Sequence, residues 1–371
     1  AADFENQLFE RGGSWTRVLL DAVLQDENIC IRKAANGGAG QAAARCMDSE
    51  LEFLQQLSRV TLVDLTGGEE SLAFLPRWET EEVDFAAAYA ERLAEVGQKG
   101  YGMFARHHMF TIEDGSLIPV RFPDPQRLSE LPGYEHEREK VIANTKALLS
   151  GKPAVNVLLY GDAGTGKSSS VKAIANEFAA DGLRLVEVKK NQLYQIPALL
   201  DSLAQNPLKF ILFIDDLSFS ANDDNFAALK AILEGSVGGR SQNVVVYATS
   251  NRRHLIKETM SDRSGDDIHE ADTRQELMSL SARFGLTVTF QRPDKVRFEE
   301  ILLDLAKQYG VQMPSDQLFI KGEAFAIRAG GRSPRVARQF IELLSPLHAG
   351  HLVAQLVVLG QHLLRDRRPH T

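Results

Sequence analysis

The sequence predicts an α/β fold in which helices cover both faces of a five-stranded parallel sheet. From residue 155 onward, short apolar runs alternate with segments of helical periodicity, and continuous apolar runs are typical of strands buried on both faces. A glycine-rich octet at 161–168 separates the first run from a helical segment, at the strand end where such sheets bind ligands. The expected strands are 155–160, 183–188, 210–214, 244–248 and 286–290, with helices over 167–180, 192–204 and 223–233.

The N-terminal third is predicted to be mainly helical. Apolar residues at helical spacing predict a helix over 15–33. Ser49 and Glu52 match a capping box, so we expect a second helix to begin there. Alternating residues on either side of an Asp-Gly pair predict a hairpin near 110–122.

Prolines at 123, 125 and 132 mark a linker after this hairpin. We therefore expect three parts: a mainly helical accessory domain over 1–124, the α/β domain over 125–292, and a C-terminal helical lid over 293–371.

Charge is unevenly distributed along the chain. Residues 1–120 carry 20 acidic and 10 basic side chains, and residues 121–371 carry the remaining 30 acidic and 32 basic ones. The acidic front argues against a DNA-binding arm, and nothing indicates nucleic acid as a partner. Two cysteines in 371 residues predict a reducing compartment, so we expect a cytoplasmic location. No apolar run approaches the roughly 18 residues of a spanning helix, so no membrane association is expected.

The octet has the spacing G-x-x-x-x-G-K-S between a strand and a helix, which predicts a phosphate cradle. A turn that merely joins strand to helix would explain a pair of glycines but not the whole pattern. We expect Lys167 to reach the β- and γ-phosphates of ATP, and the Ser168 hydroxyl to ligate Mg²⁺. The expected nucleotide-binding residues are Gly161, Asp162, Ala163, Gly164, Thr165, Gly166, Lys167, Ser168 and Ser169.

The apolar run at 210–214 ends in two carboxylates, Asp215 and Asp216. We expect Asp215 to lie beside the glycine loop and hold the metal, and Asp216 to orient or deprotonate the attacking water. The alternative is that the pair only begins a polar loop.

Three further residues complete the expected site. Asn251 follows the strand at 244–248 and can share a hydrogen bond with the attacking water and the γ-phosphate, unless it is only a turn residue. Arg283 precedes the last strand, faces away from its own nucleotide, and suits transition-state stabilisation in a neighbouring subunit. Arg335 lies in the first turn of a helix capped by Ser333 and should point back toward the phosphates.

In their order and spacing these motifs resemble Walker A, Walker B, sensor 1, arginine finger and sensor 2 of AAA+ ATPases. The chain more closely resembles a bacterial family of predicted AAA+ ATPases of unassigned function, over residues 131–344. The segments that carry this resemblance are 133–135, 144–145, 164–169, 215–219, 248–255 and 279–285.

The resemblance implies hydrolysis of ATP to ADP and phosphate, with Mg²⁺, in a homo-oligomer completed by Arg283. Two departures from the family pattern bear on this. Asp216 stands where most AAA+ proteins have Glu, as in the replication-initiator type, so we expect slow hydrolysis. Ala282 stands where a polar or acidic neighbour of the arginine finger is expected.

Three classes of function compete for such an ATPase. An unfoldase would need a glycine-flanked aromatic pore loop, and Tyr194 lacks the glycines. A replication initiator or helicase loader remains the alternative, although the acidic front shows no basic helix-turn-helix. We favour a protein whose slow ATP hydrolysis controls how it binds an unidentified protein partner through residues 1–124.

Three other features have plain interpretations. The glycines at 36–40 lack a following Lys-Ser and suit a hinge better than a second phosphate loop. His107 and His108 have no partner at metal-ligand spacing. The acidic stretch at 252–279 is expected to be a solvated loop, with a metal site as the alternative.

Overall fold

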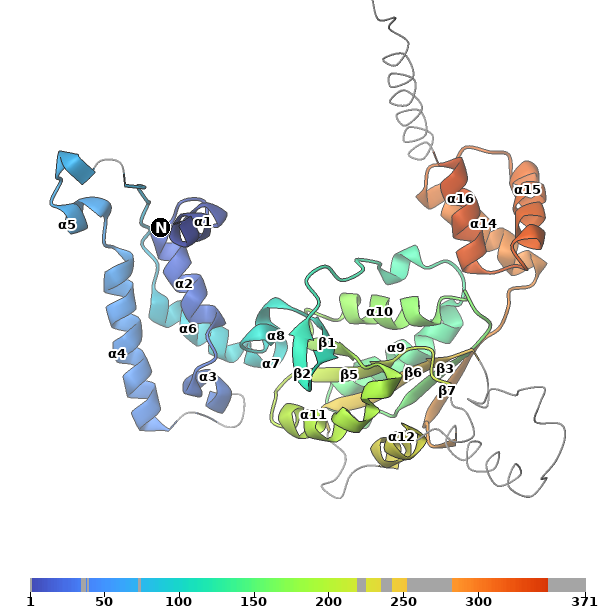
Figure 1. The fold of residues 1–371 in the computed structure, drawn as a ribbon, viewed down its shortest axis with the longest axis horizontal. Coiled ribbons are helices and arrows are strands. Elements are labelled where there is room, and N and C mark those ends of the chain that lie inside the picture. The colour runs from blue at the N-terminus through green and yellow to red at the C-terminus, as the bar shows by residue number, and fades with distance from the viewer. Residues whose placement is uncertain are drawn as a thin grey trace, which may run out of the picture.

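A seven-stranded sheet forms the centre of the computed structural model, which describes residues 2–34, 38, 40–72, 75–218, 225–234, 242–251 and 282–345. The strand order is β2-β1-β4-β5-β6-β3-β7 (Figure 1). Only β1 and β2 are antiparallel, and every other pair of neighbours is parallel. The strands are β1 Met109–Glu113, β2 Ser116–Pro119, β3 Val157–Gly161, β4 Leu183–Glu187, β5 Lys209–Ile214, β6 Val244–Ser250 and β7 Leu286–Phe290.

The expectation of five strands is wrong, because the hairpin joins the sheet. The five expected strands are present as β3 to β7. The predicted hairpin forms β1 and β2, and β1 then pairs in parallel with β4. Phe110 and Ile112 of β1 are almost fully buried, so joining the sheet covers apolar surface that a free hairpin would expose.

Successive residues of the central strands enter two different cores. On β5, Ile211 and Phe213 pack with α9 and α10, whereas Phe210 and Leu212 pack with α11 and α12 on the other face (Figure 1). This alternation follows from the two-residue period of a strand, and it explains why the strand is apolar at every position. The helices are α9 Glu135–Leu149, α10 Lys167–Glu177, α11 Ile196–Leu203 and α12 Asn225–Glu234.

Three helices follow β7 in the part of the chain predicted to be a lid, and they share the core of the α9 and α10 side. Phe298, Leu305 and Phe340 belong to the same apolar cluster as Val141 of α9 and Val171 of α10. The lid helices are α14 Lys295–Gln308, α15 Ser315–Arg328 and α16 Pro334–Leu344. No helix within the described ranges is long and apolar enough to cross a membrane.

The N-terminal helices pack around Leu51, Phe85 and Tyr89. The expected helix over 15–33 is two helices, because Asn28 caps a new one by accepting a hydrogen bond from the Ile31 amide. The capping box expected at Ser49 is absent, since the helix begins eight residues earlier in an alanine-rich turn. The helices are α1 Ala2–Glu10, α2 Trp15–Gln25, α3 Ile29–Ala34, α4 Gln41–Ser58, α5 Leu62–Thr66, α6 Phe85–Ala94, α7 Val96–Lys99 and α8 Met103–Arg106.

Arg184 of β4 joins these helices to the sheet. Its buried guanidinium donates to the carbonyls of Lys99 and Phe104, at 3.2 and 2.8 Å, and to the carbonyls of Ala179, before β4, and Leu183, at its start. Burial, with a smaller effect of Arg92, lowers the pKa of Arg184 to about 10. The division at residue 124 stays a prediction, and the pairing of β1 with β4 favours a boundary before Met109.

Candidate nucleotide-binding site

The glycine loop connects β3 to α10, as the sequence predicts. Gly161 has φ of +138°, and a Cβ atom there would lie 2.0 Å from the carbonyl oxygen of Phe290 on the neighbouring strand β7. Only glycine fits that position. Gly164 and Gly166 also have positive φ, and α10 begins at Lys167 directly afterwards. The first turn of α10 therefore presents its N–H groups where the loop closes, an arrangement that suits an anion.

The Lys167 ammonium is held inside the loop. It donates to the carbonyls of Gly161 and Asp162, both at 2.8 Å, and to Oδ1 of Asn251 at 3.1 Å. Burial lowers the pKa of Lys167, and nearby carboxylates, first Asp162, oppose this effect. Lys167 therefore brings a positive charge to a partly desolvated site.

Asp215 meets the loop directly at the end of β5. Its Oδ1 accepts a hydrogen bond from Ser168 Oγ at 2.6 Å, and another from the hydroxyl of Thr249 on β6. Three groups share this carboxylate oxygen, because the amide of Asp216 also donates to it at 3.1 Å. A hydroxyl and a carboxylate oxygen in contact are a donor pair that Mg²⁺ prefers.

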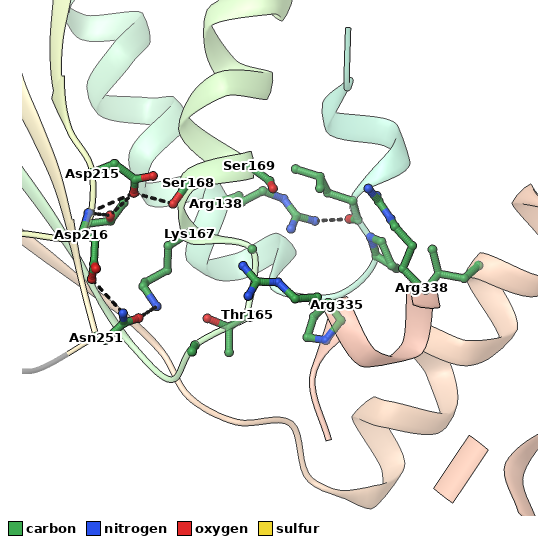
Figure 2. A pocket seen from close by; sticks show the side chains of 18 residues that line it. Arg138, Thr165, Lys167, Ser168, Ser169, Asp215, Asp216, Asn251, Arg335 and Arg338 are labelled. Carbon is green, nitrogen blue, oxygen red and sulfur yellow. Dashed lines mark hydrogen bonds between the residues drawn. The ribbon is translucent and has the colours of Figure 1, made fainter. Parts of the chain in front are cut away.

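Asp216 has a left-handed backbone, with φ of +49°, which turns the chain sharply after β5. Its amide donates to Thr249 Oγ1 at 2.9 Å, and its carboxylate accepts from Asn251 Nδ2 at 2.8 Å. Asn251 thus bridges Lys167 and Asp216, as Figure 2 shows.

Strand order explains why these residues meet. In the sheet β6 lies between β3 and β5, so the glycine loop, Asn251 and Asp215 follow three adjacent parallel strands. The carboxyl ends of parallel strands lie on one edge of a sheet, and chemistry carried by successive strand ends is brought together there.

The lid reaches the loop from the other side. Ser333 caps α16 by accepting from the Val336 amide, and the amide of Arg335 donates to the carbonyl of Gly164 at 3.1 Å. The Asp162 carboxylate accepts from the amide of Arg292, just after β7, at 2.9 Å. Asp162 and Gly164 of the glycine loop are therefore both hydrogen-bonded to the chain after β7.

A cavity of about 420 Å³ lies between the strand ends, which we call the sheet wall, and the lid, which we call the lid wall. Four basic and two acidic side chains line it, an excess of positive charge that suits a polyanion accompanied by a divalent cation. The lining residues are Leu131, Pro132, Arg138, Ala163, Gly164, Thr165, Gly166, Lys167, Ser168, Ser169, Asp215, Asp216, Thr249, Asn251, Leu305, Pro334, Arg335 and Arg338 (Figure 2).

Three expected site residues do not line the cavity. Gly161 and Asp162 instead accept hydrogen bonds from Lys167 through their carbonyls. Arg283 is half-buried and stands before β7, next to the buried Phe284, away from the lining of its own chain's cavity.

Sequence reasoning missed the linker and lid residues of the cavity. Arg338 lies three residues after Arg335 and so shares its helix face, a signal that could have identified it. Arg138 and Leu131 gave no such signal, because nothing in the local sequence shows that the linker folds over the glycine loop.

Several expectations lie outside the described residues. The acidic stretch over 252–279 belongs to that part of the chain, as do residues 36, 37 and 39 of the glycine-rich segment 36–40. Within the described ranges, no group of three His, Cys, Asp or Glu side chains could hold a metal ion. His108 contacts Asn176 Oδ1 at 2.9 Å, and burial lowers the pKa of His107.

Comparison with protein families matches residues 104–347 to a family described as "Protein of unknown function (DUF815)". Two Holliday junction branch migration complex subunits RuvB are similar in sequence. The one from Bdellovibrio bacteriovorus is 26% identical over 221 residues, which is 59% of this chain and 62% of that protein. The one from Fusobacterium nucleatum is 25% identical over 225 residues, 59% of this chain and 61% of that protein.

Other similarities are shorter or weaker. The replication factor C large subunit of Thermofilum pendens is 29% identical over 119 residues, 30% of this chain and 28% of that protein. Among solved structures, the Thermotoga maritima RuvB branch migration motor is 20% identical with a TM-score of 0.38, over 59% of this chain and 63% of that one. The chain thus spans less than two thirds of the proteins that it matches. The matched family and the RuvB sequences confirm the resemblance inferred from the motifs.

Proposed function

The chain belongs to the family described as "Protein of unknown function (DUF815)", and on that premise we propose that it binds ATP with Mg²⁺ and hydrolyses it slowly to ADP and phosphate. The observation that carries this proposal is the contact of Ser168 with Asp215, which joins the glycine loop to the acid-ended strand. A loop that only connected β3 to α10 would not need that contact.

Each residue of the sheet-side wall has a distinct proposed role. Lys167 binds the β- and γ-phosphates, and Ser168 and Asp215 hold Mg²⁺, which neutralises phosphate charge when bound. Asp216 orients the attacking water and accepts its proton, and Asn251 holds the Asp216 carboxylate in place through its 2.8 Å hydrogen bond. From the lid, Arg335 stabilises charge on the phosphates.

Slow hydrolysis is supported by the length of the Asp216 side chain. An aspartate is one methylene shorter than the glutamate usual at this position, and the left-handed backbone of Asp216 fixes where its carboxylate can reach. A base held slightly out of place costs catalytic rate while leaving binding intact.

We infer that nucleotide state gates the grip on a macromolecular partner through the N-terminal helices, in the cytoplasm. The alternative, a DNA-associated ATPase, is favoured by the names of the relatives, a branch migration subunit and a replication factor. The excess of ten acidic over basic residues in 1–120 argues against DNA contact there.

Binding through Lys167 is tested by replacing it. Lys167→Ala should abolish the thermal stabilisation by MgATP, which amounts to several degrees for a tight ligand. Lys172→Ala is the matched control: it lies on the same helix, pairs with Glu187 at 3.2 Å, and does not line the cavity. The control should keep the stabilisation, and stabilisation by ATP that survives in Lys167→Ala as well would overturn the assignment.

We also propose that Arg283 acts on the nucleotide of a neighbouring subunit in a homo-oligomer. Its place outside the cavity of its own chain supports this role. Activity per molecule should then rise with protein concentration, and mixing Arg283→Ala with Lys167→Ala chains should restore activity that neither has alone. Full activity in a strictly monomeric preparation would contradict the role.

A further inference from the structure

The cavity has a polar end and an apolar end. Lys167, Ser168 and Asp215 form the polar end, at the start of α10. Apart from Ala163 in the glycine loop and Pro334 beside Arg335, the apolar side chains come from the linker and from α14, and they are Leu131, Pro132 and Leu305. In the proposed function the phosphates occupy the polar end, which leaves the apolar end for the nucleoside.

One of the charged side chains of the cavity, Arg138, is hydrogen-bonded to this apolar end. Arg138, near the start of α9, has only 7% of its side chain exposed, and its Nη2 donates to the carbonyl of Leu131 at 2.7 Å. That bond holds the guanidinium beside the linker wall. Nη2 also contacts Glu135, at 3.1 Å, whose own side chain is 66% exposed.

The guanidinium has donors that this anchoring does not use. Both hydrogen bonds leave from Nη2, and within the described residues Nε and Nη1 have no partner. Both atoms keep some accessible surface, because neither is among the fully buried polar atoms that have no hydrogen-bond partner. Arg138 is part of the lining of this cavity, and also of a second cavity that shares Leu131 and Pro132 with it. A buried guanidinium with unused donors at a binding cavity is costly unless a ligand completes it, and burial indeed lowers the pKa of Arg138.

We propose that Arg138 recognises the nucleoside part of the bound nucleotide by donating to its acceptor atoms, the ring nitrogens of the base or the ribose oxygens. A guanidinium only donates hydrogen bonds, so it selects for acceptors at this end of the cavity. This inference rests on the proposed function. It assigns nucleoside recognition to Arg138 and leaves the phosphates to Lys167 and Arg335.

Two probes separate this role from phosphate binding: MgATP, and magnesium tripolyphosphate, which has the phosphates but no nucleoside. Affinities are measured by calorimetry on the full chain. Arg138→Met should weaken ATP about tenfold or more, the effect of losing a charged hydrogen-bond donor, and change tripolyphosphate less than about twofold. Arg335→Met should weaken both probes.

The matched control is Glu135→Gln, which removes the acidic partner of Arg138 but no donor from the cavity, and both affinities should be retained. Arg138→Lys keeps the charge and loses the planar fork, so it should also lose affinity for ATP and not for tripolyphosphate. It replaces Arg138→Met should that variant fail to fold.

Two results would overturn the proposal. Equal losses for both probes in the Arg138 variants would assign Arg138 to the phosphates, and unchanged affinities for both would make it only an anchor of Leu131. If the wild-type chain bound neither probe, the proposed function would fall and this inference with it. If the wild-type chain bound both probes and the Arg138 variants changed both affinities equally, this inference alone would be wrong and the proposed function would stand.

Discussion

The two walls of the cavity are built differently. On the sheet side, Ser168, Asp215, Thr249, Asp216 and Asn251 are hydrogen-bonded to one another at the ends of adjacent strands. On the lid side, the lining residues come from helices that follow β7, and a few backbone contacts attach them to the loop. The sheet wall thus fixes the reacting groups relative to one another, whereas the lid wall depends on how its helices are held.

Tyr134 is part of what holds the lid. Its ring stacks on Phe290 at 5.3 Å and lies under the guanidinium of Arg297, 4.5 Å away, while its hydroxyl donates to the carbonyl of Gln291. Burial raises the pKa of Tyr134 well above its usual range, so the hydroxyl remains a donor. Tyr134, which precedes α9, therefore holds the segment between β7 and α14 in place.

The largest effect is expected from adding a side chain at Gly161, where the glycine loop passes close to β7. Gly161→Ala places a Cβ atom against the carbonyl of Phe290, which cannot move without disrupting β7, so we expect a loss of about 4 kcal/mol or more in unfolding free energy. Gly151→Ala is the matched control, because its φ is also positive and nothing lies within 4 Å. It should cost only about 1 kcal/mol. Urea unfolding of both variants measures the difference; similar losses would show that the clash is relieved.

A smaller effect on rate should separate the two carboxylates of the sheet wall. Asp216→Asn should bind ATP normally and hydrolyse it about 100-fold more slowly, because a general base is lost. Asp215→Asn should in addition remove the Mg²⁺ dependence of ATP binding. Asp201→Asn, an exposed residue of α11, serves as the control. Wild-type turnover by Asp216→Asn would show that another group orients the water.

The smallest effect concerns the attachment of the lid wall. Asp162→Ala removes the acceptor of the Arg292 amide, so we expect a fluorescent ATP analogue to dissociate roughly three- to tenfold faster, as for the loss of one exposed hydrogen bond. Asp162→Asn keeps an oxygen acceptor and should dissociate at nearly the wild-type rate. Equal acceleration in both variants would mean that the charge of Asp162, and not its hydrogen bond, retains the nucleotide.

The sheet wall could be predicted from the sequence, and the lid wall only in part. Asp215 and Asn251 each follow an apolar strand, and a parallel sheet places such strand ends at one edge whatever the side chains between them. Arg335 could be predicted because a Ser-Pro helix start fixes its position in the first turn.

The rest required tertiary information. Arg138 and Leu131 reach the cavity only because the linker folds over α10, which no periodicity encodes. The hairpin was expected, but its pairing with β4 was not, since alternation within a hairpin does not specify its neighbour. The same limit hid the role of Asp162, whose carboxylate accepts from the amide of Arg292, 130 residues later in the chain.

The junction at Arg184 has a mechanical consequence. Its guanidinium ties the carbonyls of Lys99 and Phe104 to β4, which lies beside the strand that carries Asp215. Pulling the N-terminal helices away from the sheet would break these hydrogen bonds and leave the buried Arg184 cation, which has no acidic hydrogen-bond partner, unsatisfied. That is strongly unfavourable. Force applied to those helices is therefore transmitted into the sheet.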